Sequence, residues 1–146
     1  MKKLFALFMS VAMVACMAVP AFAADVCVGE YDYTIGSGST TWNGKDKDKL
    51  FGLYAGNATW HVSNTNNTPT VNAYLMKIRT LAPDKEVARM STIGKQPKTA
   101  TFVAEDTGYY AKITASNNRG TTGRTWIDQD SSIVNLRNAS MNFRNW

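Results

Sequence analysis

The stretch DTGYYAKITASNNRGTTGRTW, residues 106–126, decides the fold because its side chains alternate in character along the chain. Apolar residues hold every second position from Tyr109 to Ala115, and Tyr110 and Lys112 fall on the opposite side. Strict alternation of this kind predicts a half-buried strand. A register shift by one residue would bury Lys112, so we expect this strand to be firmly placed, with Tyr110 and Lys112 facing solvent or a partner.

The same two-residue period recurs through most of the chain, and turn-forming residues separate the periodic segments. Glycine permits positive φ, proline presets φ, and Asn or Asp hydrogen-bonds its own backbone, so each cluster of these residues can reverse the chain. Strands are predicted at residues 27–35, 50–54, 59–63, 71–80, 87–93, 99–104, 109–117, 124–127 and 132–136. The expected fold is all-β, an antiparallel β-sandwich of about seven to nine short strands.

Residues 1–23 are predicted to be a cleavable secretory signal peptide. Lys2 and Lys3 precede an apolar segment, and Ala21-Phe22-Ala23 is a small-x-small cleavage site. The apolar run is short for a bilayer core of about 30 Å. We therefore expect secretion, no membrane span after cleavage, and a single domain over residues 24–146.

The two cysteines have different expected fates. Met13-Val14-Ala15-Cys16 resembles the lipobox of bacterial lipoproteins, and lipidation of Cys16 is the alternative to cleavage after Ala23. With the signal removed, Cys27 is the lone cysteine of the mature chain. Because it lies between two valines, Cys27 is predicted to be a buried strand residue, with an intermolecular bridge or a reactive thiol as alternatives.

The charge of the mature chain is small. Of 16 basic residues, Lys2 and Lys3 leave with the signal, so 14 basic and 11 acidic residues give a net charge of +3. Lysine and arginine are scattered among the acids, whereas nucleic-acid binders usually concentrate them on one face. Nucleic acid is therefore not an expected partner.

One local pattern resembles a known family. The spacing Tyr109-x-Ala111-x-Ile113-x-Ala115-x-Asn117-x-x-Gly120 is similar to the penultimate strand and turn of fibronectin type III and immunoglobulin-like domains. The preceding Asp106-Thr107-Gly108-Tyr109-Tyr110 resembles the turn that enters this strand in immunoglobulin domains, where a tyrosine closes a corner. Lys112 stands where that family has a disulfide cysteine. The resemblance implies a two-sheet sandwich and no activity.

Catalytic and metal-binding patterns are sparse. His61 is the only histidine, and its neighbours predict a strand with Trp60 and Val62 on one face and His61 facing solvent on the other. The sequence contains no nucleophile elbow, HExxH, P-loop or dinucleotide fingerprint. Asp128-Gln129-Asp130 lacks the glycine and the glutamate of a calcium loop and predicts a polar turn. We expect no catalytic residue, metal or cofactor, and a hydrolase built on His61 is the least favoured alternative.

The aromatic residues are the candidate ligand-binding groups. Trp60 and Trp126 lie in predicted strands and are expected to fill the core. Trp42 in a predicted loop and Trp146 at the last position are expected to be exposed. Together with Tyr110, they are candidates for stacking on sugars or anchoring a protein partner.

These features predict a secreted, bacterial, non-enzymatic binding module that acts at the cell surface or in the medium. Its expected partner is a cell-wall glycan or a protein. An alternative is a secreted antagonistic polypeptide, because small size, positive charge and the end Asn142-Phe143-Arg144-Asn145-Trp146 resemble lactococcin-like bacteriocins.

Overall fold

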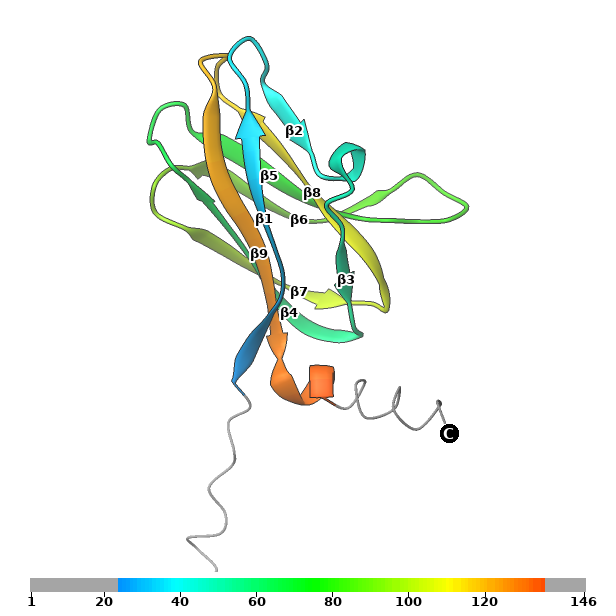
Figure 1. Ribbon diagram of the computed structural model, residues 1–146. Helices are drawn as coiled ribbons and strands as arrows, with labels where there is room; N and C mark the ends of the chain where they lie inside the picture. Colours follow the sequence, from blue (N-terminus) through cyan, green and yellow to red (C-terminus); the bar gives the residue numbers. More distant parts are fainter. Residues whose placement is uncertain (1–23, 136–146) are drawn as a thin grey trace, which may run out of the picture.

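The computed structural model describes residues 24–135, which form two antiparallel sheets packed face to face (Figure 1). The strands are β1 (Asp25–Ile35), β2 (Thr41–Asn43), β3 (Phe51–Leu53), β4 (Gly56–Asn64), β5 (Val71–Lys77), β6 (Lys85–Ile93), β7 (Lys98–Ala104), β8 (Thr107–Ala115) and β9 (Thr121–Asp130). A short 3-10 helix, η1 (Lys45–Lys47), precedes β3. The predicted all-β antiparallel sandwich is confirmed.

The two sheets have the strand order of a jelly roll. The first sheet runs β1-β9-β4-β7 and the second runs β2-β8-β5-β6, with β3 also paired to β8. The first strand therefore pairs with the last, as expected for a double-sheet jelly roll. In immunoglobulin domains the first strand pairs with the second instead. The likeness to those domains is thus local to β8, and the strand order differs.

The alternation predicted for β8 agrees with its burial except at Tyr110, which is buried on the outer side of the strand. Tyr109, Ala111 and Ile113 are buried, whereas Lys112 is exposed. The Tyr109 hydroxyl accepts a hydrogen bond of 2.8 Å from the backbone N–H of Glu105, which closes the corner before the strand. This contact is similar to the tyrosine corner that the local sequence pattern resembles.

The interior between the sheets is filled by large apolar side chains. Trp60 is completely buried, as predicted, and its indole N–H donates to the Thr125 hydroxyl at 2.8 Å. Burying a side chain of this size stabilises the fold by about 1.5–3 kcal/mol. The other fully buried large apolar residues are Tyr33, Tyr109, Phe51, Ile35, Leu75, Ile93, Ile113, Ile127, Val62 and Val71.

A buried asparagine fastens the loop between β4 and β5 to the sandwich. The Asn64 side-chain oxygen accepts hydrogen bonds from the hydroxyls of Tyr33 and Thr121, at 3.2 and 2.7 Å. Its amide nitrogen donates to the carbonyls of Asn66 and Pro69, both at 2.8 Å. Because every hydrogen-bonding group of the side chain has a partner, its burial is not penalised.

Two predictions about local structure are wrong. The strand expected at residues 132–136 is absent, because residues 131–135 are helical. Asp130 begins this turn by accepting hydrogen bonds from the backbone N–H and hydroxyl of Ser132, at 2.7 and 2.6 Å. Trp42 is predicted to lie in a loop, but it belongs to β2, which pairs with β8.

Several expectations concern parts of the chain outside the described residues. These are the signal peptide at residues 1–23, the lipobox cysteine Cys16 and the carboxyl-terminal Trp146. Within residues 24–135, no helix is long and apolar enough to cross a membrane.

Candidate functional site: a groove along β9

Three depressions in the described surface lie along β9 on the outer side of the first sheet, and neighbouring depressions share a lining residue. One, of about 540 Å³, contains Asp25, Asp128 and Asp130. A second, of about 250 Å³, is lined by Cys27, Glu30, Arg124, Trp126 and Asp128. The third, of about 440 Å³, contains Asp32, Lys95 and Arg124. Asp128 lines the first two and Arg124 lines the last two, so the depressions follow β9, and we name them together the β9 groove.

The strand register explains which side chains meet in this groove. Trp126 lies directly opposite Glu30 on β1 and directly opposite His61 on β4. Because successive strand residues point to opposite faces, Thr125 and Ile127 are buried while Trp126 and Asp128 point outward. The centre of the groove is therefore built from neighbouring positions on three strands.

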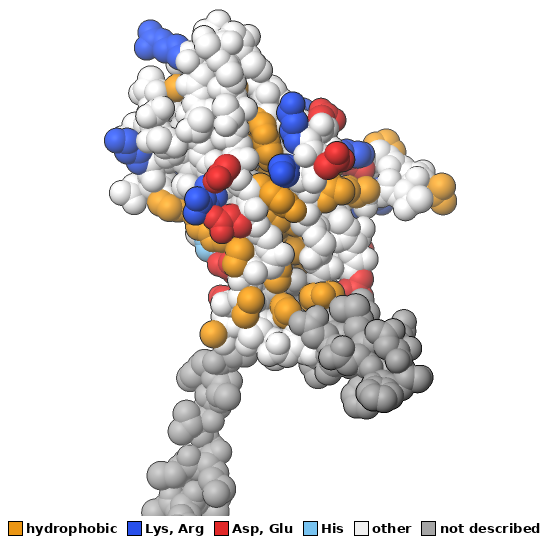
Figure 2. Space-filling view, viewed as in Figure 1, with side chains coloured by type: hydrophobic (Ala, Val, Ile, Leu, Met, Phe, Trp, Pro, Cys, Tyr) orange, Lys and Arg blue, Asp and Glu red, His pale blue; other side chains and the backbone are white. Residues whose placement is uncertain are grey.

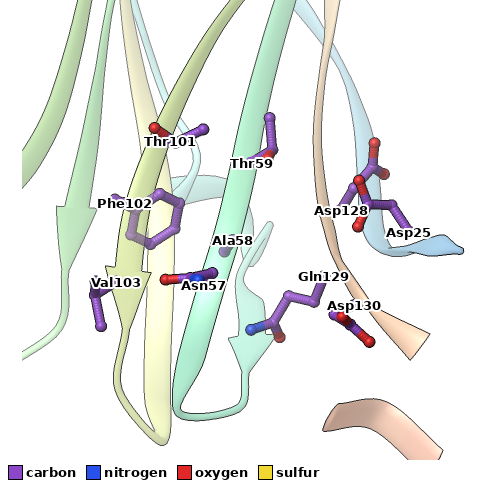
Figure 3. Close-up of a pocket in the computed structure, with 10 residues that line it drawn as sticks. All are labelled: Asp25, Asn57, Ala58, Thr59, Thr101, Phe102, Val103, Asp128, Gln129 and Asp130. Atoms are coloured by element: carbon purple, nitrogen blue, oxygen red, sulfur yellow. The ribbon is translucent and has the colours of Figure 1, made fainter. Parts of the chain in front are cut away.

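The first depression, at one end of the sheet, is also lined by side chains from neighbouring strands. Figure 3 shows Asp25, Asp128 and Asp130 on its β1 and β9 side, and Thr59 and Thr101 on β4 and β7. In the space-filling view, acidic and basic side chains gather near the single histidine at the left of the molecule (Figure 2). The first depression offers the hydroxyl groups of the two threonines and the carboxylates of the three aspartates to a ligand.

The Trp126 ring is held in place by His61. The two ring centroids are 4.8 Å apart and the ring planes differ by 1°. Neighbouring strands are also about 4.8 Å apart, so the rings stand on the sheet and stack across it. One face of the indole is covered by His61, and the other is turned toward β1 and the depression that holds Glu30. The expectation that Trp126 fills the core is therefore wrong.

The His61 imidazole lies close to a carboxylate. Its Nε2 is 2.9 Å from Oδ2 of Asp128, but the angles of a hydrogen bond are not met, and Nε2 is buried without a hydrogen-bond partner among the described residues. The close approach is best read as an ion pair that forms when His61 is protonated. His61 lies on the outer strand face as predicted, but its side chain is only 18% exposed because Trp126 covers it.

This pair supplies only part of a hydrolytic site. Within residues 24–135, Nε2 of His61 has no hydrogen-bond partner, and no group of three or more His, Cys, Asp or Glu side chains could hold a metal ion. A triad requires a nucleophile in contact with the base. The arrangement therefore provides a base and an acid without an assembled nucleophile.

Arg124 connects β9 to two acidic residues of β1. Its Nη1 is 2.6 Å from Oε1 of Glu30, and its Nε donates to Oδ1 of Asp32 at 3.1 Å. The hydrogen bond to Asp32, followed by the charge of Glu30, raises the pKa of Arg124. The guanidinium is fixed in orientation while about half of the side chain stays exposed. It can therefore still present free N–H groups to a ligand.

Cys27 lines the same groove, contrary to its predicted burial. It is exposed on β1 opposite Asp128, and its pKa is raised by partial burial and, to a smaller extent, by the charges of Asp128 and Glu30. A β-bulge between Cys27 and Gly29 explains the difference. Val28 is the extra residue and packs against the core, so Cys27 points outward instead of following the inward side of β1.

Trp42 and Tyr110, two of the three residues predicted to bind a ligand, lie on the second sheet and outside the β9 groove. Trp42 is buried beside Tyr33, with ring centroids 6.0 Å apart, so its expected exposure is wrong. Tyr110 is on the outer side of β8 as predicted, yet it is 7% exposed because Lys45 and Asp84 cover it. A binding role for Trp42, Tyr110 and Trp146 stays a prediction, and burial leaves the first two rings little surface for contact.

The groove residues that the sequence prediction missed had a readable signal. Arg124, Trp126 and Asp128 alternate with Thr125 and Ile127, and only the polar Gln129 before Asp130 interrupts the pattern. The predicted strand ends at residue 127, and the acidic residues beyond it are predicted to form a turn. Extending the two-residue period to Asp130 would have placed all four side chains on one face.

Comparisons with known proteins bear on the fold. No protein-family model and no curated protein sequence matches this chain. Among solved structures, the pre-peptidase C-terminal domain of collagenase from Bacillus anthracis is 16% identical with a TM-score of 0.51, over 67% of this chain and 86% of that domain. This likeness shows a shared β-sandwich fold.

Two further structures are more distant. The Yersinia pseudotuberculosis-derived mitogen is 13% identical with a TM-score of 0.49, over 71% of this chain and 86% of that one. The N-terminal cellulose-binding domain of Cellulomonas fimi β-1,4-glucanase C is 13% identical with a TM-score of 0.43, over 70% and 78% of the two chains.

Proposed function

We propose that this protein is a secreted, non-enzymatic binding module that holds a saccharide in the β9 groove. The observation that carries the proposal is the position of Trp126. His61 stacks on one face of the indole, and the other face is turned to a depression walled by Glu30, Arg124 and Asp128. An aromatic face fits the C–H face of a sugar ring, and charged side chains around it hydrogen-bond the hydroxyl groups.

The exposure of the acidic residues favours binding over catalysis. Glu30 and Asp32 are 46% and 76% exposed, and both are bound to Arg124. Enzymes usually place a general acid or base in a buried environment that shifts its pKa toward the working pH. Open carboxylates fixed by a guanidinium are better suited to accept hydrogen bonds from a ligand.

Secretion belongs to the same proposal and is supported by the sequence of residues 1–23. A lysine-led apolar segment with a small-x-small cleavage site is typical of exported proteins. A cell-wall glycan is the ligand class that an exported saccharide-binding module would meet at the cell surface.

The test is binding of the purified protein to a glycan panel and to isolated cell wall, with Trp126→Ala as the decisive variant. We expect an affinity loss of about tenfold or more, because a central aromatic anchor contributes about 2 kcal/mol. Tyr74→Ala is the matched control, since it removes an aromatic ring that faces Arg89 on the other sheet. Equal binding by wild type and Trp126→Ala, with both folded by circular dichroism, would remove the proposed site.

A further inference from the structure

The lining of the β9 groove has an excess of negative charge. Its carboxylates are Asp25, Glu30, Asp32, Asp128 and Asp130, and its cations are Arg124 and Lys95. Arg124 is already paired with Glu30 and Asp32. The rest of the lining therefore offers acceptors and negative charge at the end of the groove near Asp25.

The charges lie next to the face of Trp126 that is turned away from His61. Glu30 is directly opposite Trp126 in the register, and Asp128 lies two positions further along β9. An indole face attracts cations as well as C–H groups. A ligand group that carries a positive charge and an apolar ring face fits both features.

We propose that the ligand is a linear polysaccharide of amino sugars with free amino groups, lying along β9. This inference rests on the proposed saccharide-binding function and deepens it. The β9 residues that line the depressions run from Thr122 to Asp130, and at about 3.3 Å per residue they span roughly 26 Å. That length accommodates several sugar rings end to end, with ammonium groups near Asp25 and Asp128 and a ring on Trp126.

A polysaccharide fits this surface better than a basic peptide does. Extended peptides bind sheets mainly by adding a strand to an open edge, where main-chain groups are unpaired. The groove lies over β9, which is paired on one side with β1 and on the other with β4. Its lining also includes Thr59, Thr101 and Thr122, whose hydroxyls pair well with sugar hydroxyls.

The experiment compares oligomers of glucosamine with oligomers of N-acetylglucosamine of the same length, by calorimetry at low and high salt. We expect the amine form to bind at least several-fold tighter and to weaken as salt rises, because exposed charge pairs are screened. Asp25→Asn should lower affinity for the amine form about two- to fivefold and leave the acetylated form unchanged. Asp46→Asn in η1, outside the groove, is the control for loss of one negative charge.

The other outcomes distinguish failure of the amino-sugar inference from failure of the proposed saccharide-binding function. If both oligomers bind equally and Trp126→Ala abolishes both, the saccharide function stands and the amino-sugar preference is overturned. Oligolysine serves as the competitor that represents a basic peptide. If oligolysine displaces the bound saccharide at a lower concentration than free glucosamine oligomer does, the occupant is a basic peptide and the inference is overturned. If no saccharide binds, both proposals are overturned.

Discussion

The Trp126 indole and the His61 imidazole stack with their planes 1° apart across the pair of strands β9 and β4. The two residues are direct register partners, so the sheet itself fixes the distance between the rings. An aromatic group that is already held in place loses less conformational entropy when a ligand binds. His61 is therefore a positioning residue for Trp126.

The first prediction is that His61→Ala weakens saccharide binding, whereas His61→Phe retains it. A stacked pair contributes about 0.5–1.5 kcal/mol, so His61→Ala should reduce affinity by up to about tenfold. Phenylalanine keeps the stack and removes the ring nitrogens. Calorimetry with the three proteins measures the effect, with Thr99→Ala on the other side of His61 as the control. Equal losses in His61→Ala and His61→Phe would assign the effect to the nitrogens instead.

The sequence predicts the alternating strands, but it does not predict where a strand departs from the alternation or where a short strand forms by pairing. Tyr109 and Lys112 show their opposite faces in the sequence, and both lie where the pattern predicts. Cys27 could not be placed because the extra residue of a bulge depends on how β1 meets β9. Trp42 could not be placed because the three residues of β2 form a strand only through pairing with β8.

The candidate site was missed for a related reason. Gln129 is a polar residue on the inward side of β9, where it exchanges hydrogen bonds with the backbone of Tyr54 at 3.1 and 2.9 Å. Trp126 is predicted to lie in the interior because it is a large aromatic residue in a strand-like context, and the polar Gln129 interrupts the apolar alternation beyond Ile127. Tertiary partners that satisfy a buried polar group are not visible in a local pattern.

The second prediction concerns the Cys27 thiol. In a Cys16→Ser background, iodoacetamide should label Cys27 in the folded protein, because the side chain is exposed. Labelling should be slower at neutral pH than for an unfolded cysteine, since the raised pKa leaves less thiolate, and the rate should increase as the pH rises. Asp128→Asn should speed the reaction by removing a charge that opposes the thiolate.

Mass spectrometry of the labelled protein measures these rates. A ligand in the groove should slow labelling, because Cys27 and Trp126 line the same depression. Labelling that requires denaturant would contradict the exposed position of Cys27.

The third prediction links stability to pH through Asp84. The Lys45 ammonium, 2.7 Å away, contributes most to lowering the pKa of Asp84, and the Arg79 backbone N–H and the Tyr110 hydroxyl add to it. Because the folded pKa is below the unfolded value of about 3.9, this stabilisation is present above that pH and is lost as the pH falls through the folded pKa. Asp84→Asn should therefore destabilise the protein at neutral pH and reduce the loss of stability on acidification.

Urea unfolding at neutral pH and at about pH 3 tests the linkage. Asp46→Asn changes the charge by the same amount in the neighbouring turn and should leave the difference between the two conditions close to wild type. If Asp84→Asn lowers the free energy of unfolding by the same amount at both pH values, its effect comes from packing alone.

The fourth prediction is that Gly123→Ala destabilises the sandwich. A Cβ at position 123 would overlap the Ser63 carbonyl and the Tyr33 hydroxyl, which donates to Ser63 at 3.0 Å and to Asn64 at 3.2 Å. Since the Ser63 contact is with backbone, its relief requires movement of β4, and relief of the second contact requires displacement of the Tyr33 ring. Overpacking of this kind costs about 1–3 kcal/mol, and loss of the buried hydrogen bonds adds to it.

Urea unfolding measures the loss, and Gly52→Ala is its matched control, because a Cβ at position 52 meets no atom within 4 Å. We expect Gly52→Ala to stay close to wild type, and Gly123→Ala to unfold at a clearly lower urea concentration with an unchanged slope. The loop held by Asn64 should loosen in the same variant. Displacement of Tyr33 removes one of the two hydroxyl groups that donate hydrogen bonds to the Asn64 side-chain oxygen. The backbone N–H of Lys95 donates to the Asn67 side chain of this loop at 2.9 Å, so faster amide exchange at Lys95 in Gly123→Ala than in Gly52→Ala would show the loosening. Equal exchange would separate the overpacking at Gly123 from the Asn64 network.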